Sequence, residues 1–64
     1  IEACYQQEAM NFNTAKACAH QMSRFMPKII EVRQVTRDGY IYCERGETSE
    51  GELSVAFQSG RLVF

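Results

Sequence analysis

The 64-residue sequence predicts a single α+β domain, residues 1–64, with one N-terminal amphipathic helix packed on an antiparallel sheet of about four strands. Two observations favour this class. Apolar residues recur at helical spacing in the first part of the chain, and from Lys28 onwards they alternate at the period of a strand. Two short turn signals, Asp38-Gly39 and Ser59-Gly60, then divide the second part into two hairpins.

Residues 1–26 carry the helical pattern. An apolar stripe forms at about 100° per residue; it comprises Ile1, Cys4, Tyr5, Phe12, Ala15, Cys18, Ala19, Met22 and Met26. We expect the helix over 14–26, with Asn13 as its N-cap, because Pro27 pushes the preceding residue towards extended geometry. Residues 1–10 leave three alternatives open, namely an extension of this helix, a separate short helix or an edge strand, and we expect helix there.

Asp38-Gly39 predicts a two-residue turn between strands at roughly 28–36 and 40–45. In the resulting register the facing pairs are Arg37 and Tyr40, Thr36 and Ile41, Val35 and Tyr42, Gln34 and Cys43, Arg33 and Glu44, and Val32 and Arg45. Alternation then places Ile30, Val32, Ile41 and Cys43 on the core face, and Val35, Tyr40 and Tyr42 on the other face with Arg33 and Glu44.

The second hairpin is predicted from Leu53 to Phe64, after a polar loop over residues 46–52. The Ser59-Gly60 turn pairs Gln58 with Arg61, Phe57 with Leu62, and Val55 with Phe64. This register places five large apolar residues together on one face: Leu53, Val55, Phe57, Leu62 and Phe64.

Composition indicates a cytoplasmic protein. Three cysteines cannot all pair within one chain, which fits a reducing compartment, although a Cys4–Cys18 disulfide across a helical hairpin stays open. No run of about 18 apolar residues is present, so we expect no membrane span. The chain starts at Ile1 and not at Met, which fits a fragment or a processed product.

No catalytic, cofactor or metal signature is readable, and we expect a protein that is not an enzyme. Cys18 and His20 point about 200° apart on a helix, and Cys43 is expected in the core, so no thiol has a base within reach. The cysteines and the histidine lack zinc spacing, and the acidic loop Glu44–Glu52 lacks the calcium-loop pattern.

The preferred binding site is the outer face of the first hairpin, which we call the hairpin face. It consists of Arg33, Val35, Arg37, Tyr40 and Tyr42. Tyrosine and arginine are enriched in binding hot spots, so this face favours a protein partner; the alternative is that these residues only stabilise a solvent-facing sheet. By analogy of architecture with phage- and plasmid-borne inhibitors, we expect an inhibitor or regulator of a larger protein. Replacing Tyr42 by alanine is expected to spare the fold and weaken binding by more than about 1 kcal/mol.

Two further surfaces are alternatives. A basic flank of the helix, spaced every four residues, consists of Lys16, His20, Arg24 and Lys28. It suggests a nucleic-acid-binding regulator, against the simpler interpretation that these cations complement the helix dipole; the net charge of −1 also argues against bulk phosphate binding. The edge strand at 61–64 offers a route to strand addition or a homodimer.

Overall fold

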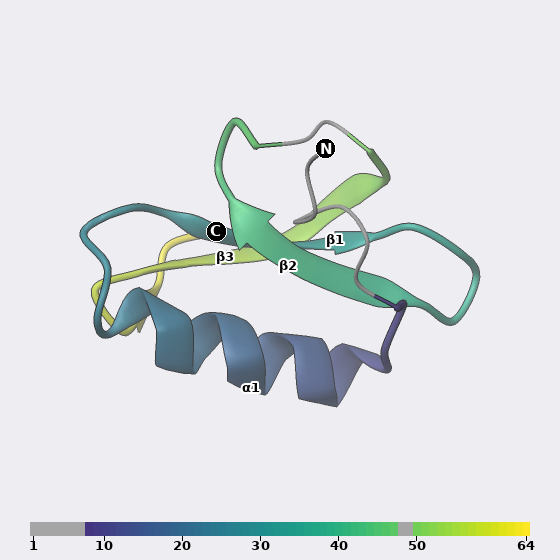
Figure 1. The fold of residues 1–64 in the computed structure, drawn as a ribbon, viewed down its shortest axis with the longest axis horizontal. Coiled ribbons are helices and arrows are strands. Elements are labelled where there is room, and N and C mark those ends of the chain that lie inside the picture. Colours follow the sequence, from purple (N-terminus) through teal and green to yellow (C-terminus); the bar gives the residue numbers. More distant parts are fainter. Residues whose placement is uncertain (1–7, 48–49) are drawn as a thin grey trace.

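A computed structural model describes residues 8–47 and 50–64. Its elements are α1 (Phe12–Ser23), β1 (Ile30–Gln34), β2 (Tyr40–Glu44), β3 (Glu52–Gln58) and β4 (Arg61–Leu62). The strands form one antiparallel sheet in the order β2-β1-β3-β4, and α1 lies along one face of it (Figure 1). This arrangement confirms the predicted α+β class.

The helix begins and ends earlier than predicted. Asn11, and not Asn13, is the N-cap, and its Oδ1 accepts a hydrogen bond of 2.8 Å from the backbone N–H of Thr14. The last helical residue is Ser23, and the N–H of Arg24 closes the final turn. The three residues before Pro27 lie outside α1, and the last of them, Met26, is disfavoured in helical geometry because it precedes proline.

The helix expected before this point is absent from the part of residues 1–10 that the structure describes. Met10 instead pairs with Tyr40 of β2 as an isolated antiparallel bridge, with N···O distances of 2.9 and 2.7 Å. Of the three alternatives, edge pairing is thus the one seen at Met10. The expectations for residues 1–7, including those for Cys4, lie outside the described residues.

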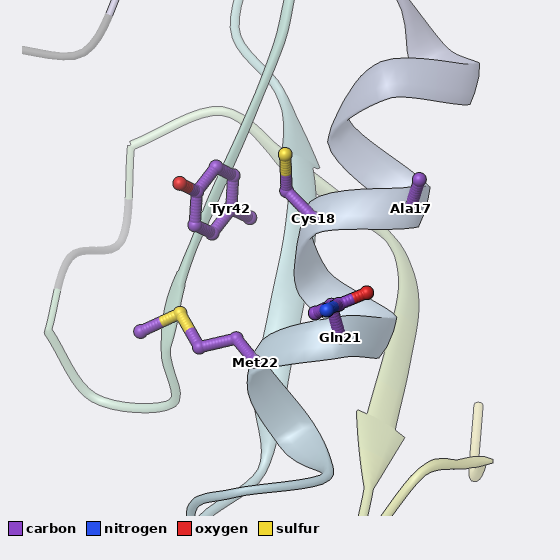
Figure 2. Close-up of a pocket in the computed structure, with 5 residues that line it drawn as sticks. All are labelled: Ala17, Cys18, Gln21, Met22 and Tyr42. Carbon is purple, nitrogen blue, oxygen red and sulfur yellow. The ribbon is translucent and has the colours of Figure 1, made fainter.

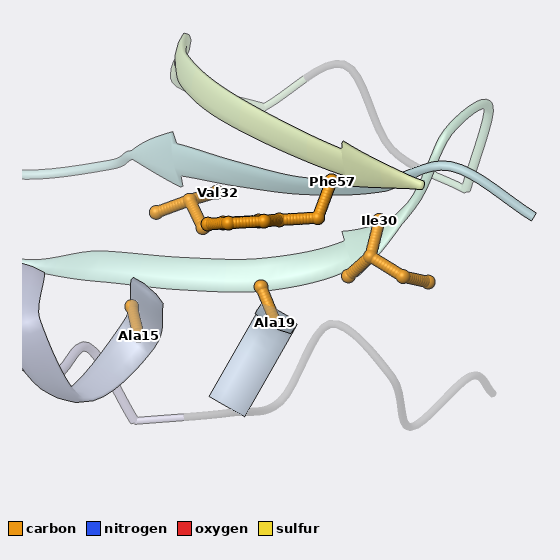
Figure 3. Close-up of a cluster of buried hydrophobic side chains, with 5 residues drawn as sticks. All are labelled: Ala15, Ala19, Ile30, Val32 and Phe57. Atoms are coloured by element: carbon orange, nitrogen blue, oxygen red, sulfur yellow. The ribbon is translucent and has the colours of Figure 1, made fainter. Parts of the chain in front are cut away.

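The core lies between α1 and the central strands. Figure 3 shows the side chains of Ala15 and Ala19 projecting from α1 towards Ile30, Val32 and Phe57 of the sheet, and all five residues are buried. The two alanines allow the helix backbone to approach the sheet closely, and each fully buried large apolar side chain stabilises the fold by about 1.5–3 kcal/mol. The described members of the predicted apolar stripe that flank this core are Phe12, Met22 and Met26.

The predicted register of the first hairpin is wrong. Val32 faces Tyr42 and not Arg45, and Gln34 faces Tyr40, so residues 35–39 separate the two strands. The register is shifted by three positions. Because side chains alternate across a sheet, an odd shift moves β2 to the opposite face relative to β1.

The conformation of Gly39 explains why Asp38-Gly39 does not form the predicted two-residue turn. It does not adopt the positive φ that its position in a type I′ turn requires. Its lack of a side chain serves packing, because a Cβ there would clash with the Thr36 hydroxyl and the Ala9 methyl group. The Gly39 carbonyl accepts hydrogen bonds from the N–H groups of Val35 and Thr36, which closes a wider loop.

The second hairpin follows the predicted register. Gln58 faces Arg61 and Phe57 faces Leu62. Ser59 and Gly60 have φ values of 54° and 79°, as a type I′ turn requires.

A bulge in β3 changes one face of this hairpin. Val55 pairs with Val32 and Leu53 with Arg33, so the register shifts between these two pairs. Leu53 therefore lies on the face away from α1, whereas Phe57 and Val55 pack towards the core. The expectation that Leu53 shares their face is wrong.

Candidate functional site

The residues of the hairpin face do not form one surface. They were predicted to be Arg33, Val35, Arg37, Tyr40 and Tyr42. Tyr40 and Tyr42 are half-buried against the core, and the Tyr40 ring meets the Phe12 ring edge-on with centroids 5.1 Å apart. Arg33 lies on the opposite face of the sheet, and Val35 and Arg37 lie in the loop between β1 and β2. Because the register differs from the predicted one, these five residues do not share a face, and the predicted site is wrong.

Tyr42 instead lines an open pocket between α1 and β2. The pocket measures about 420 Å³ and is bordered by Ala17, Cys18, Gln21, Met22 and Tyr42. Figure 2 shows Cys18 and Met22 reaching from the helix towards Tyr42 on the strand. The lining residues include no carboxylate or imidazole, so the pocket offers apolar contacts and a half-buried thiol but no acid–base pair.

Cys18 and His20 face different surroundings, in line with their helical spacing. The imidazole Nε2 of His20 donates a 2.9 Å hydrogen bond to the carbonyl oxygen of Gly60, in the turn between β3 and β4. Its ring also meets the Phe57 ring edge-on, with centroids 5.3 Å apart. His20 therefore connects the helix to the sheet, at a distance from the pocket that Cys18 lines.

The face of the sheet away from α1 carries an ion cluster made of Glu31, Arg33 and Arg45. Both oxygens of the buried Glu31 carboxylate are 2.8 Å from a guanidinium nitrogen, one from Arg33 and one from Arg45. Arg33 also donates to the carbonyl oxygens of Glu50 and Gly51, at 2.8 and 3.0 Å, which fastens β1 to the start of β3.

These contacts set the charge of Glu31. Burial alone raises the pKa of its carboxyl group, but the hydrogen bonds and positive charges of Arg45 and Arg33 outweigh burial and lower this pKa below its ordinary value. A carboxylate held ionised in this way is a poor general acid, so we interpret the cluster as structural. The sequence contained a signal for part of it, because residues 31 and 33 share one face of a strand.

Ile41 and Cys43 are buried on this same face. They were expected to share a face with Ile30 and Val32. All four residues are buried, but the two pairs lie on opposite faces of the sheet. Alternation alone could not separate the two faces at this point, since each of them carries buried residues.

The basic flank is only partly available to a ligand. His20 is engaged with Gly60, and the Lys28 ammonium lies 3.8 Å from a Glu44 carboxylate oxygen. The Lys16 ammonium lies 5.9 Å from the centre of the Phe12 ring, and Lys16 and Arg24 are both exposed. Within residues 8–47 and 50–64, neither of these two cations forms an ion pair with a carboxylate.

The end of α1 is attached to the β3–β4 turn. The Ser23 hydroxyl is buried; it donates to the His20 carbonyl oxygen at 2.8 Å and accepts from the Gly60 N–H at 3.1 Å. The stem of Arg24 covers Gly60, because a Cβ at that position would lie 3.0 Å from Arg24 Cγ. Two exposed cations, Arg24 and Arg61, are therefore held beside the start of β4.

The candidate site is the β4 edge surface, which comprises Arg61, Leu62, Val63 and Phe64. Leu62, Val63 and Phe64 are 59%, 48% and 65% exposed, although all three are large and apolar. β4 is the outermost strand of the sheet on this side. The sequence marked 61–64 as an edge, but the strand order and the exposure of its side chains show that the apolar ones are left uncovered.

Neither a metal site nor a membrane span is seen in the described residues. No cluster of three or more His, Cys, Asp or Glu side chains there could hold a metal ion, and no helix there is long and apolar enough to cross a membrane. No family model, curated protein or solved structure matches the chain.

Proposed function

We propose that this chain is a small, non-enzymatic protein-binding module that inhibits or regulates a larger protein through its β4 edge surface. The observation that supports this most is the exposure, at 48–65%, of Leu62 on the edge strand β4 and of Val63 and Phe64 directly after it. Contiguous exposed apolar side chains on a small domain commonly mark a site of protein–protein interaction.

The chemistry of the edge supports the same proposal. An edge strand presents backbone N–H and C=O groups that can pair with another chain, and proteins usually protect such edges with charges, proline or bulges. Of residues 61–64 only Arg61 is charged; Leu62 ends β4, and the two residues after it are also apolar. A partner that covers them would gain apolar contact and backbone hydrogen bonds together.

The absence of an enzymatic role is part of the proposal and is supported by the surroundings of the reactive groups. The Cys18 thiol lines an apolar pocket while the His20 imidazole is bound to Gly60. The Glu31 carboxylate is held ionised between two guanidinium groups. Among residues 8–47 and 50–64, none of the three has the partner that nucleophilic or general acid–base catalysis requires.

The test is capture of the partner from cells of the organism that encodes the chain, followed by mass spectrometry. A Leu62→Ser, Phe64→Ser double variant should recover less than about a tenth of the partner, because its two most exposed edge side chains become polar. Phe25→Ser is the matched control: Phe25 is 75% exposed but belongs to no strand. Thermal unfolding of each variant establishes that the fold is intact.

Two results would contradict the proposal. One is undiminished capture by the double variant, and the other is an equal loss in the Phe25→Ser control, which would indicate general adhesion of exposed apolar groups.

A salt titration of binding distinguishes this proposal from the alternative of a nucleic-acid-binding regulator. Counterion release makes the affinity for a nucleic acid fall steeply with salt concentration, whereas an apolar edge responds weakly.

A further inference from the structure

We infer that the β4 edge surface binds an extended acidic segment of the partner protein, which joins the sheet as a fifth strand beside β4. This inference rests on the proposed function and adds the mode of binding and the charge of the partner. Three features of the edge carry it: the direction of its backbone groups, the distribution of its apolar side chains, and the cations beside it.

Only alternate residues of the β4 segment direct their backbone hydrogen-bonding groups towards β3. The N–H of Val63 donates a 2.9 Å hydrogen bond to the carbonyl oxygen of Ala56, so Val63 directs its backbone groups towards β3. In an antiparallel pair the next residue along the strand directs its N–H and C=O to the other side. The N–H and C=O groups of Leu62 therefore point away from β3, towards the free edge of the sheet, and no described residue bonds to them. An extended chain placed there would find one donor and one acceptor in strand geometry.

The apolar side chains of the edge are divided between the two faces. Leu62 is paired with Phe57 and so lies on the face that carries α1. Val63 is next to it and lies on the other face. Both remain about half exposed. The side chains of an added strand also alternate between the faces, so some would pack on Leu62 and others on Val63. Such cross-strand pairs stabilise a sheet.

Positive charge gathers beside the edge. The stem of Arg24 packs on Gly60 from the α1 side, and Arg61, at the start of β4, lies like Val63 on the face away from α1. Two of the described carboxylates are already paired away from this edge: Glu31 is bound by two arginines on the far face, and Glu44 is paired with Lys28. An incoming strand with carboxylates on its α1 side would therefore be complementary to Arg24, and Arg61 adds positive charge on the other face of the same edge.

The same cations argue against a second copy of the chain as the occupant. Pairing β4 with β4 about a two-fold axis perpendicular to the sheet leaves both helices on one face. Arg24 and Arg61 of one copy would then approach those of the other, and like charges placed across an interface are unfavourable. An acidic partner meets this charge with the opposite sign, and for that reason we prefer it to a homodimer.

The test uses the whole isotopically labelled chain and short blocked peptides as probes. One peptide alternates valine with glutamate, and its control alternates valine with lysine. The glutamate peptide should shift the backbone amide resonance of Leu62 and bind at least about tenfold more tightly than the lysine peptide, as expected for two or three exposed charge pairs. Arg24→Glu should remove this preference, and Arg37→Glu, an equal charge change in the distant β1–β2 loop, should not.

Peptide N-methylation tests the strand geometry. Only alternate residues of an added strand direct their N–H groups towards β4. Methylating the backbone nitrogens of one alternate set should abolish binding, and methylating those of the other set should leave it unchanged. Equal tolerance of both sets would overturn strand addition.

Three other results would overturn the inference: equal binding of the two peptides, a dimer of the free chain in sedimentation that is lost on Leu62→Asp, or displacement of the glutamate peptide by a single-stranded oligonucleotide. These failures are distinguishable from failure of the proposed function. If native partner capture depends on Leu62 and Phe64 but no acidic peptide binds, the inference fails and the proposed function stands. If capture does not depend on them, the proposed function fails whatever the peptides do.

Discussion

At the scale of single residues, the role of a side chain in this protein follows from its neighbours more than from its type. Two tyrosines that the sequence suggested for partner contact pack against the core, and Glu31 is buried between two arginines on the other face of the sheet. The Ser23 hydroxyl joins the last turn of α1 to the turn before β4. Of these contacts only the Glu31–Arg33 pair is foreshadowed locally, by its spacing along one strand; Arg45, Phe12 and Gly60 lie far along the chain from the residues that they contact.

Glu31→Gln is expected to make stability less dependent on pH. Because the folded-state pKa of Glu31 lies below its ordinary value, its stabilising contribution is complete above the ordinary glutamate pKa of about 4.3 and is lost as pH falls through the folded-state value. At pH 7 the variant should lose about 1–3 kcal/mol of unfolding free energy, and this difference should shrink towards pH ~3.

Urea denaturation of wild type and variant at both pH values measures this difference. Glu52→Gln, at an exposed glutamate, is the control and should change little. A loss of equal size at both pH values would show that the charge of Glu31 is not what stabilises the fold.

Tyr40→Ala is expected to destabilise the fold. It removes the ring that meets Phe12 and packs against the core, so the unfolding free energy should fall by about 2–4 kcal/mol. Tyr40→Phe keeps the ring and should cost far less. Chemical denaturation of the two variants decides the matter, and an alanine variant as stable as wild type would mean that Tyr40 faces solvent, as the sequence had suggested.

At the scale of elements, turn chemistry identified both hairpins but set the register of only one. Ser59-Gly60 adopts the left-handed geometry that its residues favour, and β3 and β4 pair as predicted. Asp38-Gly39 carries the stronger signal, yet a wider loop forms there. That loop lets Tyr40 pair with Met10 and reach Phe12, contacts that a tight turn would have directed to the other face. Tertiary packing therefore overrode a local preference.

The two glycines allow a matched test of this account. Asparagine tolerates positive φ, so Gly60→Asn should be mild, whereas Gly39→Asn should be strongly destabilising because any Cβ there meets Thr36 and Ala9. We expect a loss of at least about 2 kcal/mol in unfolding free energy for Gly39→Asn and under about 1 kcal/mol for Gly60→Asn. Equal tolerance of the two would indicate that both glycines sit in type I′ turns, which would restore the predicted register.

At the scale of the whole molecule, composition and periodicity were enough to predict one helix on a four-stranded antiparallel sheet. They could not predict the site. The hairpin face depended on a register that an odd shift reversed, and the buried Ile41 and Cys43 made the two faces of the sheet indistinguishable by hydrophobicity. The β4 edge surface was foreseeable as an edge, but its exposure depends on strand order, which local patterns do not encode.

Hydrogen–deuterium exchange of the captured complex tests the binding account most directly. The Leu62 amide points towards the free edge of the sheet, so it should exchange quickly in the free chain and slowly in the complex. The amide of the next residue, Val63, is already bonded to Ala56 and provides an internal reference. Slowed exchange at Leu62 is the result we expect. Unchanged exchange at Leu62, with new protection confined to the loop around Arg37, would contradict the account and return the binding site to the first hairpin.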